Sequence, residues 1–146
     1  MRRLIPFIAL VALAFAAATA LGASKRPAKV GLARSSLGKI IVNGSGRTLY
    51  LFTKDARNKD KCVAISGCTG VWPPLTTHGK PVAGPGVSSR LLGTITIAGG
   101  AKQVTYAGHP LYTYSADFGP HQTDYVGVSQ FGGKWYALNG AGHTVK

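Results

Sequence analysis

The 146-residue sequence contains no glutamate, and its only acidic residues are four aspartates. Pairs of carboxylates for acid–base catalysis are therefore scarce. The same shortage leaves 17 lysines and arginines almost unopposed, with a formal net charge of +13 at pH 7. The four acids are Asp55, Asp60, Asp117 and Asp124.

Motifs that mark common catalytic and metal sites are also missing. The four histidines show neither HExxH nor any other paired spacing of a zinc site. There is no G-x-S-x-G element, Walker loop or dinucleotide-binding fingerprint. We therefore predict a protein that is not an enzyme and has no cofactor or metal ligands. The four histidines are His78, His109, His121 and His143. Histidines with such spacing are typical of surface loops. The alternative is that they converge on a metal or a haem.

The sequence has only two cysteines, Cys62 and Cys68. Neither lies near the N-terminus, so no lipid can be attached to a new N-terminal cysteine after export. In an exported protein the two are expected to form a disulfide, because the compartment outside the inner membrane oxidises such pairs. The five intervening residues do not match the spacing of redox-active pairs. We interpret the bond as structural, with a contribution of about 2 kcal/mol.

The N-terminus has the pattern of a secretory signal peptide. Two arginines precede an apolar run over Leu4–Ala18, and an A-x-A cleavage site ends at Ala20. Cleavage there removes two of the 17 basic residues, so 15 remain against four acids and the net charge becomes +11. An uncleaved anchor is the alternative, although the run is alanine-rich and interrupted by Pro6. We expect a secreted or periplasmic protein without lipid.

A ten-residue pattern occurs twice, 62 positions apart, at Gly46–Asp55 and Gly108–Asp117. Farther along, Gly70–Leu75 aligns with Gly133–Leu138, and each segment carries a tryptophan. Two copies of one unit therefore build most of the chain. The motif residues are Tyr50, Phe52 and Asp55 in the first copy and Tyr112, Tyr114 and Asp117 in the second.

Short strand-like runs separated by many of the 20 glycines predict an all-β fold. We expect two pseudo-symmetric repeats of short antiparallel strands in one small domain, after an N-terminal signal helix. The expected divisions are a signal peptide (1–20), a flexible basic arm (21–36), repeat one (37–83), a connector (84–98) and repeat two (99–146). The expected strands are 39–42, 48–53, 94–98, 103–106, 111–115, 125–128 and 134–138, with a short helical turn over 87–92.

The repeated strand is expected to turn its aromatic face toward the core. Tyr112 and Tyr114 share one face of the second copy, whereas Leu111, Thr113 and Ser115 share the other. The second face is mostly polar, so we expect it to meet solvent or a partner. Because one unit buries too little apolar area to stand alone, the two aromatic faces should pack around a pseudo-two-fold axis.

Asp55 and Asp117 follow the two repeated strands and admit two interpretations. Each can cap a turn by bonding the backbone, with a further hydrogen bond to a nearby tyrosine. Alternatively, the pseudo-symmetry brings them together as ligands of a cation or as an acid pair. The strongly positive charge of the chain disfavours a cation site.

Lys54, Arg57, Lys59 and Lys61 form a basic patch between the first repeated strand and Cys62. Such a face can simply keep a secreted domain soluble. It can also attract anionic envelope polymers or lipid head groups. Nucleic acid would fit the charge, but export disfavours it. Further aromatic residues either offer a surface that stacks on sugars or fill the core: Tyr106, Tyr125, Phe131 and Tyr136.

These residues resemble a bacterial family described as a secreted repeat of unknown function, often found in predicted lipoproteins. The resemblance rests on the duplicated Tyr-x4-Asp motif, on Cys68–Leu75 and on Gln103–Tyr112, and it extends from about Gly38 to Val145. It implies no agreed activity and supplies no catalytic residues. Where lipoprotein members carry the lipidated cysteine, this sequence has Ser24.

We therefore predict an exported, non-enzymatic all-β module of the cell envelope. It would bind or support other components through its cationic and aromatic surface. The alternative is a periplasmic protein that binds a metal or cofactor for redox chemistry, using histidines and tyrosines with Asp55 and Asp117. The sequence does not indicate an oligomeric state.

Overall fold

The computed structural model describes residues 25–146, so the expected signal peptide lies outside the described residues. The described chain consists mainly of short strands, with one four-residue helix, α1 (Cys68–Val71), and two 3-10 turns, Cys62–Ala64 and Ala98–Gly100. The all-β expectation is confirmed. The strands are β1 (Lys29–Ser35), β2 (Gly38–Asn43), β3 (Tyr50–Phe52), β4 (Thr76–Thr77), β5 (Val82–Ala83), β6 (Leu92–Thr96), β7 (Lys102–Tyr106), β8 (His109–Pro110), β9 (Ser129–Gln130), β10 (Gly133–Leu138) and β11 (Thr144–Val145).

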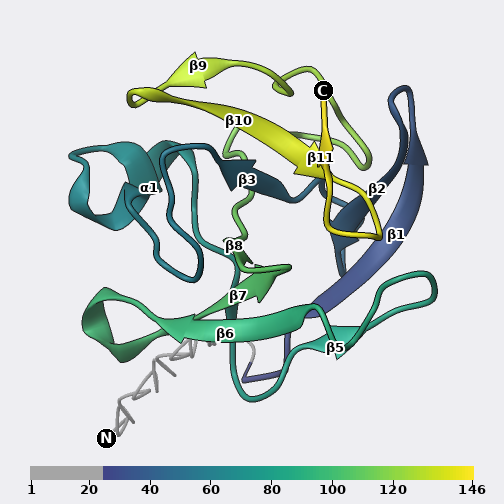
Figure 1. Cartoon of the computed structure of the whole chain (residues 1–146), viewed down its shortest axis with the longest axis horizontal. Helices are drawn as coiled ribbons and strands as arrows, with labels where there is room; N and C mark the ends of the chain where they lie inside the picture. The colour runs from purple at the N-terminus through teal and green to yellow at the C-terminus, as the bar shows by residue number, and fades with distance from the viewer. Residues whose placement is uncertain (1–24) are drawn as a thin grey trace, which may run out of the picture.

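Three small sheets form the described domain. One has the order β2-β1-β5, the second joins β11, β10 and β3 with β9 at its side, and the third joins β4, β7 and β6 with β8. Figure 1 shows β9 and β10 along one side of the molecule, β6 and β7 along the opposite side, and β3 between them. No helix among residues 25–146 has the length and apolar character needed to cross a membrane.

The first strand corrects the expectation of a flexible basic arm over residues 21–36. Lys29–Ser35 forms β1, which pairs antiparallel with β2 and parallel with β5. Val30 is fully buried and Leu32 packs against the same core, while Lys29 and Arg34 stay exposed. Burial does not alternate regularly along this strand, because Gly31 and the basic residues interrupt the two-residue pattern, so the sequence pattern did not indicate it.

The two motif copies meet at the centre of the fold. The N–H of Tyr50 donates to the carbonyl of Tyr112 at 2.9 Å, and the N–H of Tyr112 donates to the carbonyl of Tyr50 at 3.0 Å. This reciprocal antiparallel bridge relates the copies as a two-fold axis would. The expected packing of two pseudo-symmetric repeats is therefore observed.

Each repeated segment pairs with the tryptophan segment of the other repeat. In one combination β3 pairs with β10, with Phe52 opposite Trp135. In the other, Tyr112 bridges Pro74, and the N–H of Ser115 donates to the carbonyl of Val71 at 2.9 Å. The register is the same, because Tyr50 lies opposite Ala137, the equivalent of Pro74. Proline has no N–H to donate, so this second ladder remains incomplete.

Three expected elements are therefore wrong or displaced. Residues 111–115 do not form a regular strand, for the reason just given. Residues 125–128 form turns, and Gly127 has a φ of +86°. The expected helical turn over 87–92 is a non-helical turn that runs directly into β6.

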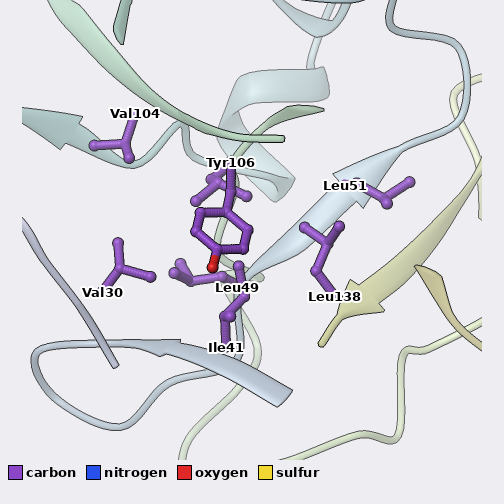
Figure 2. Close-up of a cluster of buried hydrophobic side chains, with 8 residues drawn as sticks. Val30, Ile41, Leu49, Leu51, Val104, Tyr106 and Leu138 are labelled. Atoms are coloured by element: carbon purple, nitrogen blue, oxygen red, sulfur yellow. The ribbon is translucent and has the colours of Figure 1, made fainter. Parts of the chain in front are cut away.

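Both faces of the first repeated segment are buried. Leu49 and Leu51 project into an aliphatic cluster, shown in part in Figure 2, whereas Tyr50 and Phe52 project into an aromatic cluster. In the second copy, the face expected to meet solvent does so only at Ser115, because Thr113 is half-buried and Leu111 is fully buried. The aliphatic cluster consists of Val30, Ile41, Leu49, Leu51, Val104, Tyr106, Leu111 and Leu138, and the aromatic cluster of Tyr50, Phe52, Cys62, Cys68, Trp72, Tyr112 and Trp135.

Candidate functional site

The tryptophans of the two repeats stack on each other inside the aromatic cluster. The rings of Trp72 and Trp135 are 4.0 Å apart and inclined by only 2°. Phe52 stacks on Trp135 at 4.2 Å, and Tyr114 covers Trp72 at 4.4 Å. Each tryptophan therefore lies between two aromatic rings of the other repeat. Tyr125 extends the stack beyond Tyr114 at 3.8 Å, and we call these five residues the aromatic column.

The motif tyrosines meet the column edge-on. Tyr50 contacts Trp72 and Tyr112 contacts Trp135, each with ring centroids 5.1 Å apart. Such edge-to-face contacts suit the charge distribution of aromatic rings. Both indole N–H groups donate to Gln130, Trp72 to its side-chain oxygen at 2.8 Å and Trp135 to its carbonyl at 3.3 Å. One residue thus satisfies both buried indoles.

The motif aspartates accept hydrogen bonds from the tyrosines of the opposite repeat. The hydroxyl of Tyr112 donates to Asp55 Oδ2 at 2.9 Å, and that of Tyr50 donates to Asp117 Oδ2 at 3.0 Å. A hydrogen bond to a nearby tyrosine was predicted, and the structure shows that the other copy supplies this tyrosine. Each Tyr-x4-Asp motif therefore supplies the tyrosine of one Tyr–Asp hydrogen bond and the aspartate of the other. Neither hydrogen bond forms within a single repeat.

The loop after Asp55 is held at several points. Asp55 Oδ1 accepts from the backbone N–H of Lys61 at 2.7 Å, the bond that the turn-cap interpretation expects. Cys62 and Cys68 form the predicted disulfide and are fully buried. Asn58 N–H donates across to the carbonyl of Gly108 at 2.8 Å. The loop is therefore fixed to both repeats.

The loop after Asp117 makes the equivalent crossing but lacks the disulfide. The N–H of His121 donates to the carbonyl of Gly46 at 2.9 Å, matching the bond between Asn58 and Gly108. Asp117 Oδ1 is buried without a hydrogen-bond partner. The turn-cap geometry seen at Asp55 is therefore not repeated at Asp117.

Burial shifts the proton affinities of these pairs. It raises the pKa of Asp55 to about 7, although the hydrogen bonds from Lys61 and Tyr112 oppose the shift. Burial also raises the pKa of Asp117, against the opposing effects of Tyr50 and Arg47. The pKa values of Tyr50 and Tyr112 rise through burial and through the neighbouring carboxylates. In both pairs the phenol is the donor and the carboxylate the acceptor.

All four acidic residues of the chain surround the two motif tyrosines. Asp55 and Asp60 raise the pKa of Tyr112, and Asp117 and Asp124 raise that of Tyr50. Asp60 and Asp117 are buried and Asp55 is half-buried, so only Asp124 is exposed. The acids that the sequence has are therefore concentrated inside the molecule, around the aromatic core.

The structure does not gather the candidate metal ligands. Within residues 25–146, no group of three or more His, Cys, Asp or Glu side chains is placed to hold a metal ion. His78, His121 and His143 are exposed. His109 is half-buried, and burial together with Arg57 lowers its pKa. Asp55 and Asp117 each lie with a tyrosine rather than with each other.

The basic patch lies on the loop after β3. Lys54, Arg57 and Lys59 are exposed, and Lys61 is half-buried. The Arg57 side chain donates a hydrogen bond to the carbonyl of Ala107 at 3.3 Å, so it contacts the second repeat. The basic patch and the half-buried Asp55 therefore belong to the same loop.

The aromatic residues proposed as a sugar-stacking surface have different environments. Tyr106 is fully buried in the aliphatic cluster, so of the two alternatives it fills the core. Tyr125, Phe131 and Tyr136 are half-buried and pack against the two clusters. The sequence analysis did not single out Phe118, which is 92% exposed.

Comparison with known proteins agrees with the duplicated geometry. The sequence model of a family described as a secreted repeat of unknown function matches residues 31–76 and again 93–139. No curated protein and no solved structure matches the chain. The two matches together span more than half of the chain, and each contains one Tyr-x4-Asp motif. The chain belongs to this family of secreted repeats.

Proposed function

We propose that this protein is an exported, non-enzymatic binding module that attaches through its cationic surface to anionic envelope polymers or lipid head groups. The observation that carries the proposal is the segregation of charge. Of the 15 basic residues within 25–146, 13 are exposed, whereas one of the four acids is exposed. The potential outside the protein is therefore governed by 13 exposed lysines and arginines, which a single exposed carboxylate, Asp124, offsets.

The basic patch is the strongest candidate for the contact surface. Its four charges lie within eight residues of one loop. That loop is fixed by the Asp55–Lys61 bond, the Asn58–Gly108 bond and the disulfide. A preorganised loop loses little conformational entropy when a polyanion binds. Fixed, closely spaced charges favour phosphate- or carboxylate-bearing surfaces over neutral ones.

Sedimentation with anionic vesicles and with a soluble polyphosphate tests the proposal. The mature protein should bind at about 0.01 M salt and lose most binding by about 0.15 M, because the screening length falls from about 30 Å to about 8 Å. Changing Lys54, Arg57, Lys59 and Lys61 to glutamine lowers the net charge from +11 to +7 and should weaken binding strongly. Vesicles and polyphosphate in separate arms distinguish lipid from polymer.

A second variant with the same net charge serves as the control. It replaces four exposed basic residues on separate elements by glutamine: Arg34, Lys80, Arg90 and Lys146. If binding depends on the patch, this control should bind better than the patch variant. Equal loss in the two variants would assign binding to net charge alone. Absence of binding at low salt would refute the proposal.

The proposal includes a mature chain without lipid. The support is the position of both cysteines, since Cys62 and Cys68 are joined to each other deep in the domain. Neither thiol is therefore free for acylation. The intact mass of the exported protein should equal that of the unmodified, cleaved chain, and an added diacylglycerol mass would contradict this.

A further inference from the structure

Seven aromatic side chains form a continuous network of ring contacts. Within it, each ring has a neighbour whose centroid is no more than 5.1 Å away. Tryptophan and tyrosine are the side chains most easily oxidised by one electron, and rings in contact allow an electron to pass between them. The network comprises the aromatic column, Phe52, Trp135, Trp72, Tyr114 and Tyr125, with Tyr50 and Tyr112 at its edges.

The network has one accessible end and two ends with proton acceptors. Tyr125 is half-buried, whereas Trp72 and Trp135 are fully buried. Both indole N–H groups donate to neutral oxygens of Gln130, which take up no proton. The hydroxyls of Tyr50 and Tyr112 instead donate to carboxylates. An oxidised tryptophan in the column therefore keeps its proton, while an oxidised motif tyrosine can release one.

We propose that the aromatic column carries one-electron oxidation from Tyr125 to the motif tyrosines, so that the protein donates electrons to an oxidising radical or a high-valent metal complex outside the cell membrane. In the step, the O–H bond of Tyr112 breaks and its proton forms a new O–H bond on Asp55 Oδ2. The electron leaves Tyr112 through Trp135 and the column. The products are a neutral tyrosyl radical, protonated Asp55 and an oxidant reduced by one electron.

The environment of Tyr112 favours this proton transfer above neutral pH. Burial raises the pKa of Asp55 to about 7, so its carboxylate binds a proton more strongly than an exposed one. Asp60, Lys61 and Tyr112 are the other titratable groups acting on Asp55. Below its pKa, Asp55 already holds a proton and cannot accept another. Tyr50 has the equivalent acceptor in Asp117, which is influenced by Arg47 and Asp124.

The test uses the mature protein and a photogenerated ruthenium(III) polypyridyl complex as the one-electron oxidant. Transient absorption and electron paramagnetic resonance distinguish tyrosyl from tryptophan radicals. The wild-type protein should give a tyrosyl radical. Replacing both motif tyrosines, Tyr50→Phe and Tyr112→Phe, should abolish that signal and leave a tryptophan radical. Tyr106→Phe is the matched control, because Tyr106 is buried but donates to the carbonyl of Gly140 rather than to a carboxylate.

A second measurement needs no variant. In the wild-type protein, the yield of tyrosyl radical should rise between about pH 5 and about pH 9 as Asp55, whose pKa is about 7, ionises. Peptide mapping after trapping of the radical should place the adduct on Tyr50 or Tyr112. An adduct confined to Tyr125 or Tyr136, a yield independent of pH, or equal loss of signal in Tyr106→Phe would overturn the proposal.

Discussion

Replacing Asp55 by asparagine should change how stability depends on pH. Burial raises the pKa of Asp55 from 3.8 to about 7 in the folded protein. In the unfolded chain the pKa returns to about 3.9. Between these values the folded protein keeps a proton that the unfolded chain releases. The stability due to this proton is complete below about pH 4 and is lost as the pH rises through about 7.

The magnitude follows from the size of the shift. A difference of about three pKa units corresponds to about 4 kcal/mol for a group isolated from water. Asp55 is only half-buried, so screening by solvent reduces this to about 1–2 kcal/mol. For a domain of this length, that change moves the melting temperature by about 5 °C. Asparagine does not ionise, so Asp55→Asn should lack this component.

Thermal melts of the wild type and Asp55→Asn at about pH 5 and about pH 8 measure the effect. At the lower pH the variant should be less stable by about 1 kcal/mol, because one side-chain oxygen replaces the two that accept from Lys61 and Tyr112. At the higher pH the gap should shrink or reverse.

The comparison between the two proteins isolates Asp55 from other titrating groups. His109 has a lowered pKa and acts in the opposite direction, but it is present in both proteins and cancels in the difference. Asp124→Asn is the control for the loss of one aspartate, because Asp124 is exposed. A constant gap for Asp55→Asn would mean that Asp55 is already ionised at the lower pH, which would refute the reasoning.

Two further experiments test the packing at Gly133 and the role of the disulfide. A Cβ built at Gly133 would lie 2.6 Å from Phe52 Cε2. A Cβ built at the equivalent Gly70 would have no neighbouring atom within 4 Å. In denaturant unfolding, Gly133→Ala should therefore lower the free energy of unfolding by about 1–3 kcal/mol, and Gly70→Ala should lower it by less than about 0.5 kcal/mol. Equal effects of the two substitutions would contradict the close contact between Gly133 and Phe52. Replacing Cys62 and Cys68 together by serine should lower stability by about 2 kcal/mol in the same assay, and an unchanged midpoint would contradict a structural role for the bond.

The sequence predicted the features that depend on local pattern. Alternation and glycine spacing located β2, β7 and β10 to within about two residues. The repeat predicted the pseudo-two-fold packing, because a unit of this size cannot bury its own apolar face. The disulfide followed from the number of cysteines and the exported compartment. Each of these inferences uses residues that are near one another in the chain or are related by the duplication.

Features that depend on the opposite repeat were not predictable. Residues 111–115 have the pattern of a strand, but their partner segment contains Pro73 and Pro74, so a regular ladder cannot form. The polar face of the same segment seemed suited to solvent, yet the aliphatic cluster covers Leu111. Strand propensity describes one segment, whereas a ladder requires two.

The candidate site was predicted in its residues but not in its pairing. The motif identified Tyr50, Asp55, Tyr112 and Asp117, but it did not indicate which tyrosine bonds which aspartate. The structure shows that each aspartate accepts from the tyrosine 57 or 67 positions away. Such an exchange requires both copies to be present and correctly oriented. Both the Tyr–Asp hydrogen bonds of the motif and the packing of the domain therefore depend on the duplication.

The same exchange accounts for the charge on the surface. Hydrogen bonds make a buried carboxylate less costly, and each motif tyrosine donates one such bond, to Asp55 Oδ2 and to Asp117 Oδ2. Because the chain has only four acids, placing them around the core removes nearly all negative charge from the exterior. One arrangement thus creates both a hydrogen-bonded aromatic interior and a cationic exterior. The proposed charge-dependent binding therefore depends on how few of the aspartates are exposed, and the proposed tyrosine oxidation depends on the two that accept hydrogen bonds from Tyr50 and Tyr112.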